Sequence, residues 1–497
     1  MPLAPPCYRL SIVKGGNPLS LKHIRRAIYI LILLLLVYFA TASATFLIHI
    51  HAANESIPES SLSDYPPPLP NHSLLIFSPH PDDETLGCAG LIQDALHNGS
   101  SVHVAFLTNG DGFRLAAERE FHRLNLSAED MIKFGKIRQN EAINALGKLG
   151  LPRSDVLFLG YPDQGLTHLW ENHWSASNPY TSPSTGVNSS PYSNCFHPGT
   201  KYCGSCVLAD IKDLIRKYKP TDLYVTHPLD EHPDHAAASS FVTLALAQMQ
   251  MSDPTLTSHC HLHYYLVHRG DWPVPQGLFP GKSLTPPAEM ADLDTRWSAL
   301  PLTPHEEKRK IAAIDQYVSQ TALMKRFLLS FVRTNEIFGD LPVKKIYSYT
   351  PSVDTAPDLS NIRWLHPPII EDPVDDNLLC NFLGAGDIRN IYAVTDGMYL
   401  YLKINTSEPI TSKIQYAIKI RYFGNPSLYE TGGIYAMRCI PGKPTIPNLT
   451  QSLVSKNSLY VRIPLRDIGY SHLIGMCVAS SVMGIQEDTT GYHILKM

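Results

Sequence analysis

The chain has 497 residues, of which 44% are hydrophobic, 17% charged and 9% aromatic. This composition is that of a globular protein and excludes collagen-like, fully disordered and small disulfide-scaffold proteins. At about 100–200 residues per domain, the length predicts two or three domains. The 41 basic and 45 acidic residues give a net charge of −4, which argues against a dedicated nucleic-acid-binding protein.

An uncharged apolar stretch near the N-terminus, residues 27–50, predicts a transmembrane helix. A helix of this length spans about 36 Å, enough to cross a hydrocarbon layer of about 30 Å. Basic residues come before it, among them Lys14, Lys22, Arg25 and Arg26. The positive-inside rule therefore predicts a single-pass membrane protein with residues 1–26 cytoplasmic and the body lumenal or extracellular. A cleaved signal peptide is less favoured, because its apolar region would run about 7–15 residues.

Three further features fit a lumenal or extracellular body. Residues 51–70 are rich in Ser and Pro and predict a stalk. Seven glycosylation sequons predict a glycoprotein: Asn54, Asn71, Asn98, Asn125, Asn188, Asn405 and Asn448. Eight of the nine cysteines follow the anchor, where disulfides can form. The cluster Cys195, His197, Cys203 and Cys206 predicts a disulfide-tied loop, with a structural zinc site as the alternative.

Strand-like and helix-like segments alternate over residues 71–349. Buried-strand patterns occur at 73–78, 102–108, 155–160, 222–226 and 261–267, and helical patterns at 84–97, 127–149, 208–218 and 235–249. Such alternation predicts a Rossmann-like α/β fold, a mostly parallel sheet with helices on both faces. Two insertions, 168–206 and 271–302, interrupt it. A capping box at Thr303 then opens a helix predicted to run to about Arg333.

Beyond residue 350 the pattern changes to short segments of alternating apolar and polar residues, with a hairpin signal at Asp396-Gly397. These segments predict an antiparallel β-sandwich domain over residues 350–497. The expected organisation is therefore a tail, an anchor, a stalk, an α/β domain at 71–349 and a β-sandwich.

Two clusters of His and Asp residues follow predicted strands. Residues 78–84 read SPHPDDE after the first strand, and residues 227–235 read HPLDEHPDH after the fourth. The carboxyl ends of parallel strands meet at one edge of a sheet, so we expect the clusters to lie together. A single His-Pro-Asp is usually a turn, but two such clusters favour a catalytic metal site. Such a zinc site has three protein ligands and an open water position.

The spacing within each cluster allows a division of roles. Asp82 and Asp83 are adjacent, so one can ligate the metal while the other faces its water. His232 and His235 lie three residues apart, so one can ligate while the other stabilises an oxyanion or protonates a leaving amine. Asp234 could orient that second histidine.

The sequence resembles the PIG-L/LmbE-like zinc-dependent de-N-acetylases. The matching motifs are HPDDE at 80–84, TNG at 108–110, Arg-x-x-Glu at 138–141, FLGYPD at 158–163 and HPDH at 232–235, spread over residues 72–270. The resemblance implies zinc as cofactor. It also implies a role for each matching position: His80, Asp83 and His235 as zinc ligands, Asp82 as general base, His232 as oxyanion-stabilising or acid histidine with Asp234 as its orienter, and Arg138 and Asp163 as contacts to the sugar.

The function that the resemblance implies is removal of an acetyl group from an N-acetylglucosaminyl substrate, with release of acetate. The substrate could be N-acetylglucosaminyl-phosphatidylinositol or another glycoconjugate, and no nucleic acid or nucleotide cofactor is expected. Two alternatives stay open: a membrane-anchored glycosyltransferase that uses Asp82-Asp83-Glu84 as its metal motif, and a non-catalytic carbohydrate-binding surface protein. A dinucleotide-binding oxidoreductase is disfavoured, because no G-x-G-x-x-G follows the first strand.

Overall fold

The computed structural model describes residues 29, 30, 33, 62–290, 293–350, 359, 362–374, 384–423, 432–441 and 451–497. The predicted anchor and residues 51–61 of the predicted stalk thus lie outside the described residues, except for three positions within the anchor. Among the described helices, none is long and apolar enough to cross a membrane. The chain divides into Met1–Glu55 and a compact unit, Ser56–Met497.

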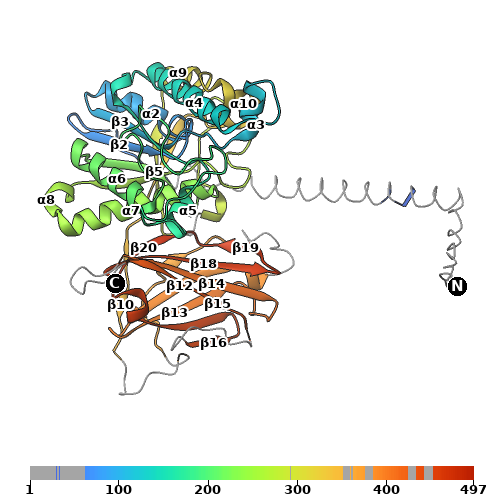
Figure 1. Cartoon of the computed structure of the whole chain (residues 1–497). Helices are drawn as coiled ribbons and strands as arrows, with labels where there is room; N and C mark the ends of the chain where they lie inside the picture. The colour runs from blue at the N-terminus through green and yellow to red at the C-terminus, as the bar shows by residue number, and fades with distance from the viewer. Residues whose placement is uncertain are drawn as a thin grey trace, which may run out of the picture. The chain divides into compact units, whose positions relative to one another are not determined.

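An eight-stranded sheet forms the first part of the compact unit (Figure 1), with strand order β1-β7-β8-β6-β5-β2-β3-β4. The strands are β1 (Ser63–Asp64), β2 (Ser73–Ser78), β3 (Ser101–Thr108), β4 (Val156–Tyr161), β5 (Asp222–Thr226), β6 (His261–Tyr265), β7 (Arg296–Pro301) and β8 (Asn335–Asp340). Strands β2 to β6 are parallel neighbours, which confirms the predicted mostly parallel sheet. The sequence did not predict β1, β7 and β8, of which β8 pairs antiparallel with both β6 and β7.

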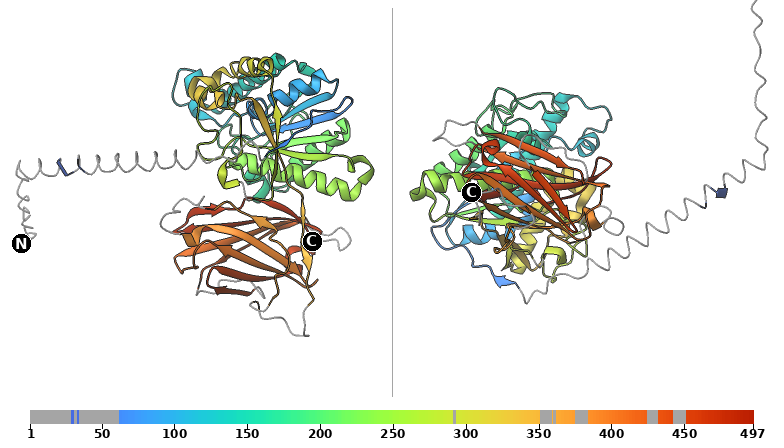
Figure 2. Two further views of the ribbon diagram at one scale, coloured as in Figure 1. Left: turned by 180° about the vertical axis from the view of Figure 1, so that it is seen from behind. Right: turned by 90° about the horizontal axis from the view of Figure 1, so that it is seen from below.

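Helices cover both faces of this sheet, as predicted (Figures 1 and 2). They are α2 (Asp83–His97), α3 (Arg114–Glu120), α4 (Ala128–Leu149), α5 (Leu166–Glu171), α6 (Gly204–Tyr218), α7 (Pro233–Ser252), α8 (Pro254–Thr257), α9 (Pro304–Ile314) and α10 (Val318–Leu329). Helices α2, α4 and α9 contact one another and share one apolar core with the sheet. Helices α5, α6 and α7 enclose a second core on the other face.

Local capping explains where the longest helices begin and end. The capping box of Ser127 opens α4, and Gly150 ends it in a left-handed conformation with φ 98°. The predicted capping box at Thr303 opens α9. The prediction of one helix to about Arg333 is wrong, because α9 ends at Ile314 and α10 begins at Val318. Tyr317 breaks the helix with a ψ of 64° and donates its hydroxyl to the carboxylate of Glu84.

Two further sheets follow, with orders β10-β12-β13-β17-β16 and β15-β14-β18-β20-β9 (Figure 2). Their strands are β9 (Lys344–Lys345), β10 (Tyr347–Ser348), β11 (Ile370–Glu371), β12 (Ile388–Thr395), β13 (Tyr399–Thr406), β14 (Ile414–Tyr422), β15 (Gly433–Cys439), β16 (Gln451–Ser455), β17 (Ser458–Pro464), β18 (Leu473–Val482), β19 (Ile485–Thr489) and β20 (His493–Lys496). Alternate side chains of both sheets, such as Leu402 and Ile418, share one buried core. The predicted antiparallel sheets are therefore present, with short parallel pairs only at β9 and β10.

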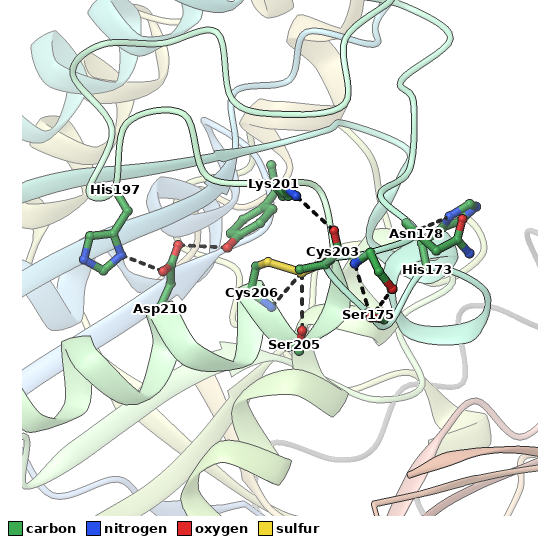
Figure 3. The surroundings of a disulfide bond; sticks show 12 residues. His173, Ser175, Asn178, His197, Lys201, Cys203, Ser205, Cys206 and Asp210 are labelled. Atoms are coloured by element: carbon green, nitrogen blue, oxygen red, sulfur yellow. Dashed lines mark hydrogen bonds and ion pairs between the residues drawn. A yellow bond between two sulfur atoms is a disulfide. The ribbon is translucent and has the colours of Figure 1, made fainter. Parts of the chain in front are cut away.

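The insertion at 168–206 contains most of α5, a loop and the start of α6, where a disulfide joins Cys203, the N-cap of the helix, to Cys206 in its first turn (Figure 3). The predicted cluster thus contains a disulfide, but the bond lies at the start of α6 and leaves Cys195 free. The alternative zinc cluster is not formed, because His197 Nδ1 lies 2.7 Å from Asp210 Oδ1 and Cys195 donates to the carbonyl of Tyr192. Among the described residues the remaining cysteines are free and buried: Cys88, Cys195, Cys260, Cys439 and Cys477.

Candidate metal centre and active site

Hydrogen bonds fix the conformation of the loop after β2. Ser78 Oγ donates to the carbonyl of His80, and Thr108 at the end of β3 donates to the carbonyl of Pro79. Asp82 follows with φ 131°, a conformation that is strained for a residue with a side chain. Its backbone N–H donates to Glu84 Oε2 at 3.1 Å, which helps to hold this geometry. Backbone strain of this kind is commonly found at functional sites.

The three predicted metal ligands converge. His80 Nδ1 lies 3.1 Å from His235 Nε2 and 3.3 Å from Asp83 Oδ2, and His235 Nε2 lies 3.1 Å from the same Asp83 oxygen. Zinc bonds of about 2.0–2.1 Å in a tetrahedral arrangement put neighbouring ligand atoms about 3.3 Å apart. The spacing and chemistry of these two imidazoles and one carboxylate therefore fit a zinc-type cation.

Each of the two histidines also contacts a carboxylate through its other ring nitrogen, the one that does not face Asp83. His80 Nε2 lies 3.1 Å from Asp163 Oδ1, and His235 Nδ1 lies 3.1 Å from Asp230 Oδ2. Such a carboxylate orients a metal-binding imidazole and strengthens its ligand nitrogen. Burial opposes protonation of His235, yet Asp230 and Asp83 raise its pKa to about 9. The site is thus rich in negative charge, which favours a bound cation.

Asp82 pairs with an arginine rather than with a histidine. Arg138 Nη2 lies 3.3 Å from Asp82 Oδ2 and also donates to the carbonyl of Pro81. Burial raises the pKa of Asp82 to about 8, although the Arg138 charge acts to lower it. Gly110 leaves room for the guanidinium, since a Cβ there would collide with Arg138.

The two residues predicted to contact the sugar are both engaged within the protein. Arg138 is only 3% exposed and Asp163 6%. The second oxygen of Asp163 accepts from the Gly112 N–H at 2.7 Å. The structure thus brings Arg138 to Asp82 and Asp163 to His80, and their contacts with a substrate stay predictions.

His232 lies against the ligand pair, with its ring centroid 4.6 Å from that of His80 and 4.8 Å from that of His235. It caps α7, because its Nδ1 accepts from the Asp234 N–H at 3.2 Å. The carboxylate of Asp234 does not reach His232. It instead accepts from the Gln164 and Leu166 N–H groups where α5 begins, and its Oδ2 lies 3.4 Å from His80 Nε2.

Sequence reasoning did not assign roles to two further residues of the site. Asp230, within the second cluster, also accepts from the N–H groups of Val267 and His268. The His268 ring lies 4.9 Å from that of His235 and stacks on Phe327 of α10. A donor atom of His268 lies within 4.8 Å of donors on Asp83 and His235. His268 follows β6 at the same sheet edge as the two clusters, and this position in the sequence could have identified it as a site residue.

Comparison with known sequences identifies this part of the chain. Residues 75–246 match the family described as PIG-L, GlcNAc-PI de-N-acetylase. This segment belongs to the PIG-L family. All the predicted metal-ligand and catalytic positions, from His80 to His235, lie within the PIG-L domain.

Two curated relatives share the PIG-L domain and carry the same name, 1D-myo-inositol 2-acetamido-2-deoxy-alpha-D-glucopyranoside deacetylase. The protein of Rhodococcus opacus (strain B4) is 31% identical over 179 residues, which are 35% of this chain and 52% of that protein. The protein of Kribbella flavida is 27% identical over 187 residues, which are 36% of this chain and 55% of that protein. The chain spans about half the length of the curated relatives it matches.

Two solved structures are similar to this chain over about half of its length. One is N,N'-diacetylchitobiose deacetylase from Pyrococcus horikoshii, with TM-score 0.34 and 17% identity, covering 55% of this chain and 84% of that one. The other is a conserved protein from Thermus thermophilus, with TM-score 0.33 and 19% identity, covering 57% of this chain and all of that one.

Proposed function

We propose that the PIG-L domain of this chain is a zinc-dependent hydrolase that removes the acetyl group from an N-acetylglucosaminyl substrate and releases acetate. One observation carries the proposal. The donor atoms of His80, Asp83 and His235 lie within 3.3 Å of one another, beside the carboxylate of Asp82. The family description and the names of the two relatives support the same reaction class.

His80, Asp83 and His235 would hold the metal, and a zinc ion bound there supplies a water whose pKa is lowered toward about 7. Asp82 is the general base of this proposal. Burial raises the pKa of its carboxyl, so the carboxylate accepts a proton readily. Arg138 and Glu84 hold Asp82 from two sides, through its carboxylate and its backbone N–H.

His232 is the proposed donor to the oxyanion that forms from the acetamide carbonyl. Burial and the neighbouring imidazoles lower the pKa of His232 to about 2, so its ring is neutral. Because Nδ1 accepts from the Asp234 N–H, the single ring proton resides on Nε2, which can donate to an oxyanion. Asp234 therefore acts on His232 through its backbone N–H, while its carboxylate contacts Nε2 of His80.

The proposed substrate carries N-acetylglucosamine linked to an inositol or a related aglycone, since the two relatives are named for an inositol glycoside. We further propose that residues 27–50 anchor the chain, with the PIG-L domain lumenal or extracellular and glycosylated. Asn71 and Asn188 are exposed in the structure and are accessible as acceptors.

The deciding experiment measures acetate release by the full-length protein from N-acetylglucosaminyl-inositol and from N-acetylglucosaminyl-phosphatidylinositol, with and without a zinc chelator. We expect release that stops with chelator and returns with zinc. The Asp82→Asn variant should lose about 10²–10⁴-fold in rate and keep its zinc, because Asp82 is not a ligand.

The matched control is Asp155→Asn, which removes a half-buried carboxylate that lies 3.3 Å from His103 at the amino end of β4. It should keep normal turnover. Normal turnover by Asp82→Asn would contradict the base assignment. Sugar transfer from a nucleotide sugar without acetate release would favour the glycosyltransferase alternative instead.

A further inference from the structure

Exposed apolar side chains are concentrated in one region of the α/β part. Between residues 62 and 340 the structure describes eight large hydrophobic residues that are exposed, and six of them belong to α3, the turn after it, α10 and the loop at 277–279. We call these six the apolar rim: Leu115, Leu124, Leu278, Phe279, Val318 and Leu323. Leu124 is 74% and Val318 60% exposed. Apolar clusters of this kind on a folded surface usually mark an interaction site.

The elements that carry the apolar rim lie side by side. Helix α3 contacts α10 (Figure 1). The loop at 277–279 is fastened to the other end of α10, because the Gly277 N–H donates to Ser330 Oγ at 2.7 Å and Arg326 Nε donates to the carbonyl of Gln276. The rim is therefore one region of the surface rather than scattered positions.

This region borders the candidate active site. Helix α3 begins two residues after Gly112. The Gly112 N–H donates to Asp163, and Asp163 in turn contacts His80. Phe327 of α10 stacks on His268, with ring centroids 5.4 Å apart. A surface that rests against the apolar rim would therefore lie close to the proposed substrate site.

Basic side chains accompany the rim. Segments 113–124, 276–282 and 318–329 contain two acidic residues, Glu118 and Glu120, and six exposed basic ones: Arg114, Arg119, Arg123, Lys282, Lys325 and Arg326. Asp130 and Asp315 pair with Arg123 and Lys325, and an excess of positive charge remains. The chain as a whole has a net charge of −4, so this basic excess is local.

Apolar residues interspersed with exposed cations match the surface of an anionic bilayer, where the apolar groups enter the acyl region and the cations meet lipid phosphates. We propose that the apolar rim docks on an anionic lipid bilayer and presents the PIG-L site to substrates held in that surface. The docking depends neither on the proposed reaction nor on the side of a membrane proposed for the PIG-L domain, and its test needs no turnover.

The test places an environment-sensitive fluorophore at position 323 of the full-length protein, through Leu323→Cys. With vesicles of phosphatidylcholine and phosphatidylglycerol we expect a blue shift and quenching by brominated lipid. Both should weaken in pure phosphatidylcholine and at high salt, because the attraction to phosphate is screened. The same fluorophore at Met483→Cys, a position 95% exposed in the turn between β18 and β19, should show neither, and the unsubstituted chain reports background labelling.

Three results would overturn the docking. The first is a probe at 323 that responds to vesicles no more than the probe at 483. The second is a blue shift without vesicles that grows with protein concentration, which would show that a second copy covers the rim. The third is a blue shift without vesicles at every concentration, which would show that the chain itself covers it.

Activity provides an independent readout. The double variant Leu115→Asp, Leu323→Asp should lose about tenfold or more in acetate release from a vesicle-bound substrate and keep its rate on a soluble N-acetylglucosaminide. The control Leu69→Asp, Met251→Asp changes two exposed apolar residues of the α/β part that lie outside the rim and should keep both rates. Equal loss on both substrates by the rim variant would contradict docking. Absence of acetate from the unmodified protein would overturn the proposed function and leave the fluorescence test valid.

Discussion

At the scale of single residues, the candidate metal centre depends on carboxylates that contact the two histidines among the predicted ligands. Asp163 contacts the far nitrogen of His80, and Asp230 contacts that of His235. These contacts fix the ring orientations and leave Nδ1 of His80 and Nε2 of His235 directed at Asp83. The geometry of the three donors therefore also depends on carboxylates that are not themselves predicted ligands.

The Asp230→Asn variant should lower zinc affinity about 10–100-fold, because it removes the carboxylate that supports His235. Competition with a chromogenic chelator measures the change. The control is Asp222→Asn, whose carboxylate contacts His72 and His263 at the other end of β5. Zinc affinity of Asp230→Asn equal to that of the control would refute the supporting role.

A second residue-scale prediction concerns stability against pH. Burial of His263 opposes its protonation, but hydrogen bonds to Asp222 and Asp340 raise its pKa to about 9 from 6.5. The folded protein therefore binds this proton more tightly, and the stabilisation is fully present below pH 6.5 and is lost as the pH rises through about 9. The loss is at most about 3 kcal/mol, reduced by solvent screening because Asp340 is half-exposed.

Urea denaturation at pH 6.5 and pH 9 measures this effect as a difference between the unmodified chain and His263→Gln. The variant cannot gain the proton, so its free energy of unfolding should fall less over this range. Parallel pH profiles for the two proteins would show that His263 contributes nothing to the pH dependence.

At the scale of elements, the break between α9 and α10 places a side chain that supports the loop of Asp82, the proposed general base. Tyr317 at the break donates its hydroxyl to Glu84, and the other oxygen of Glu84 accepts from the Asp82 N–H. A continuous helix over this stretch would carry the Tyr317 side chain elsewhere. The break therefore helps to hold the strained backbone of Asp82.

Tyr317→Phe should lower the free energy of unfolding by about 1–3 kcal/mol, because Glu84 loses a buried donor. It should also lower kcat with little change in KM, since Asp82 is held less firmly. Tyr416→Phe is the control, because it removes a buried hydroxyl that donates to the Ala385 carbonyl in the C-terminal part of the chain. If both variants lose stability and kcat equally, the effect is not specific to the Asp82 loop.

At the scale of the whole molecule, contacts join the two C-terminal sheets to the α/β part through α5. Arg421 of β14 donates to the carbonyls of Trp170 and Glu171. Lys419 Nζ and the Tyr492 hydroxyl both reach Glu171 Oε1, at 2.7 and 3.2 Å. Because the Leu166 N–H at the start of α5 donates to Asp234, one short helix separates these contacts from the candidate site.

Arg421→Met should lower the free energy of unfolding by about 2–4 kcal/mol, because two carbonyls lose a charged donor. It should also separate the unfolding of the α/β part from that of the sheets. Urea denaturation followed by tryptophan fluorescence and far-ultraviolet circular dichroism checks both. Arg216→Met removes an exposed arginine with a local partner, Asp213, and should change neither. Coincident, unshifted transitions for Arg421→Met would show that these contacts do not couple the two parts.

The sequence by itself determined the features that depend on near neighbours along the chain. The apolar run at 73–78 is β2, and the capping box of Ser127 opens α4. The two His/Asp clusters could be placed together because carboxyl ends of parallel strands share an edge. The alternation beyond residue 350 predicted antiparallel strands, because side chains of a strand alternate between its two faces.

Only the tertiary structure decided which distant groups meet. Asp163 behind His80, Tyr317 on Glu84 and His268 beside His235 join residues that follow different strands or helices. It also turned the Asp234 carboxylate toward the start of α5 rather than toward His232. Local pattern determines a residue's conformation and the face on which it lies. Contacts between distant segments depend on how whole helices and strands pack against one another, and no local pattern of the sequence specifies this packing.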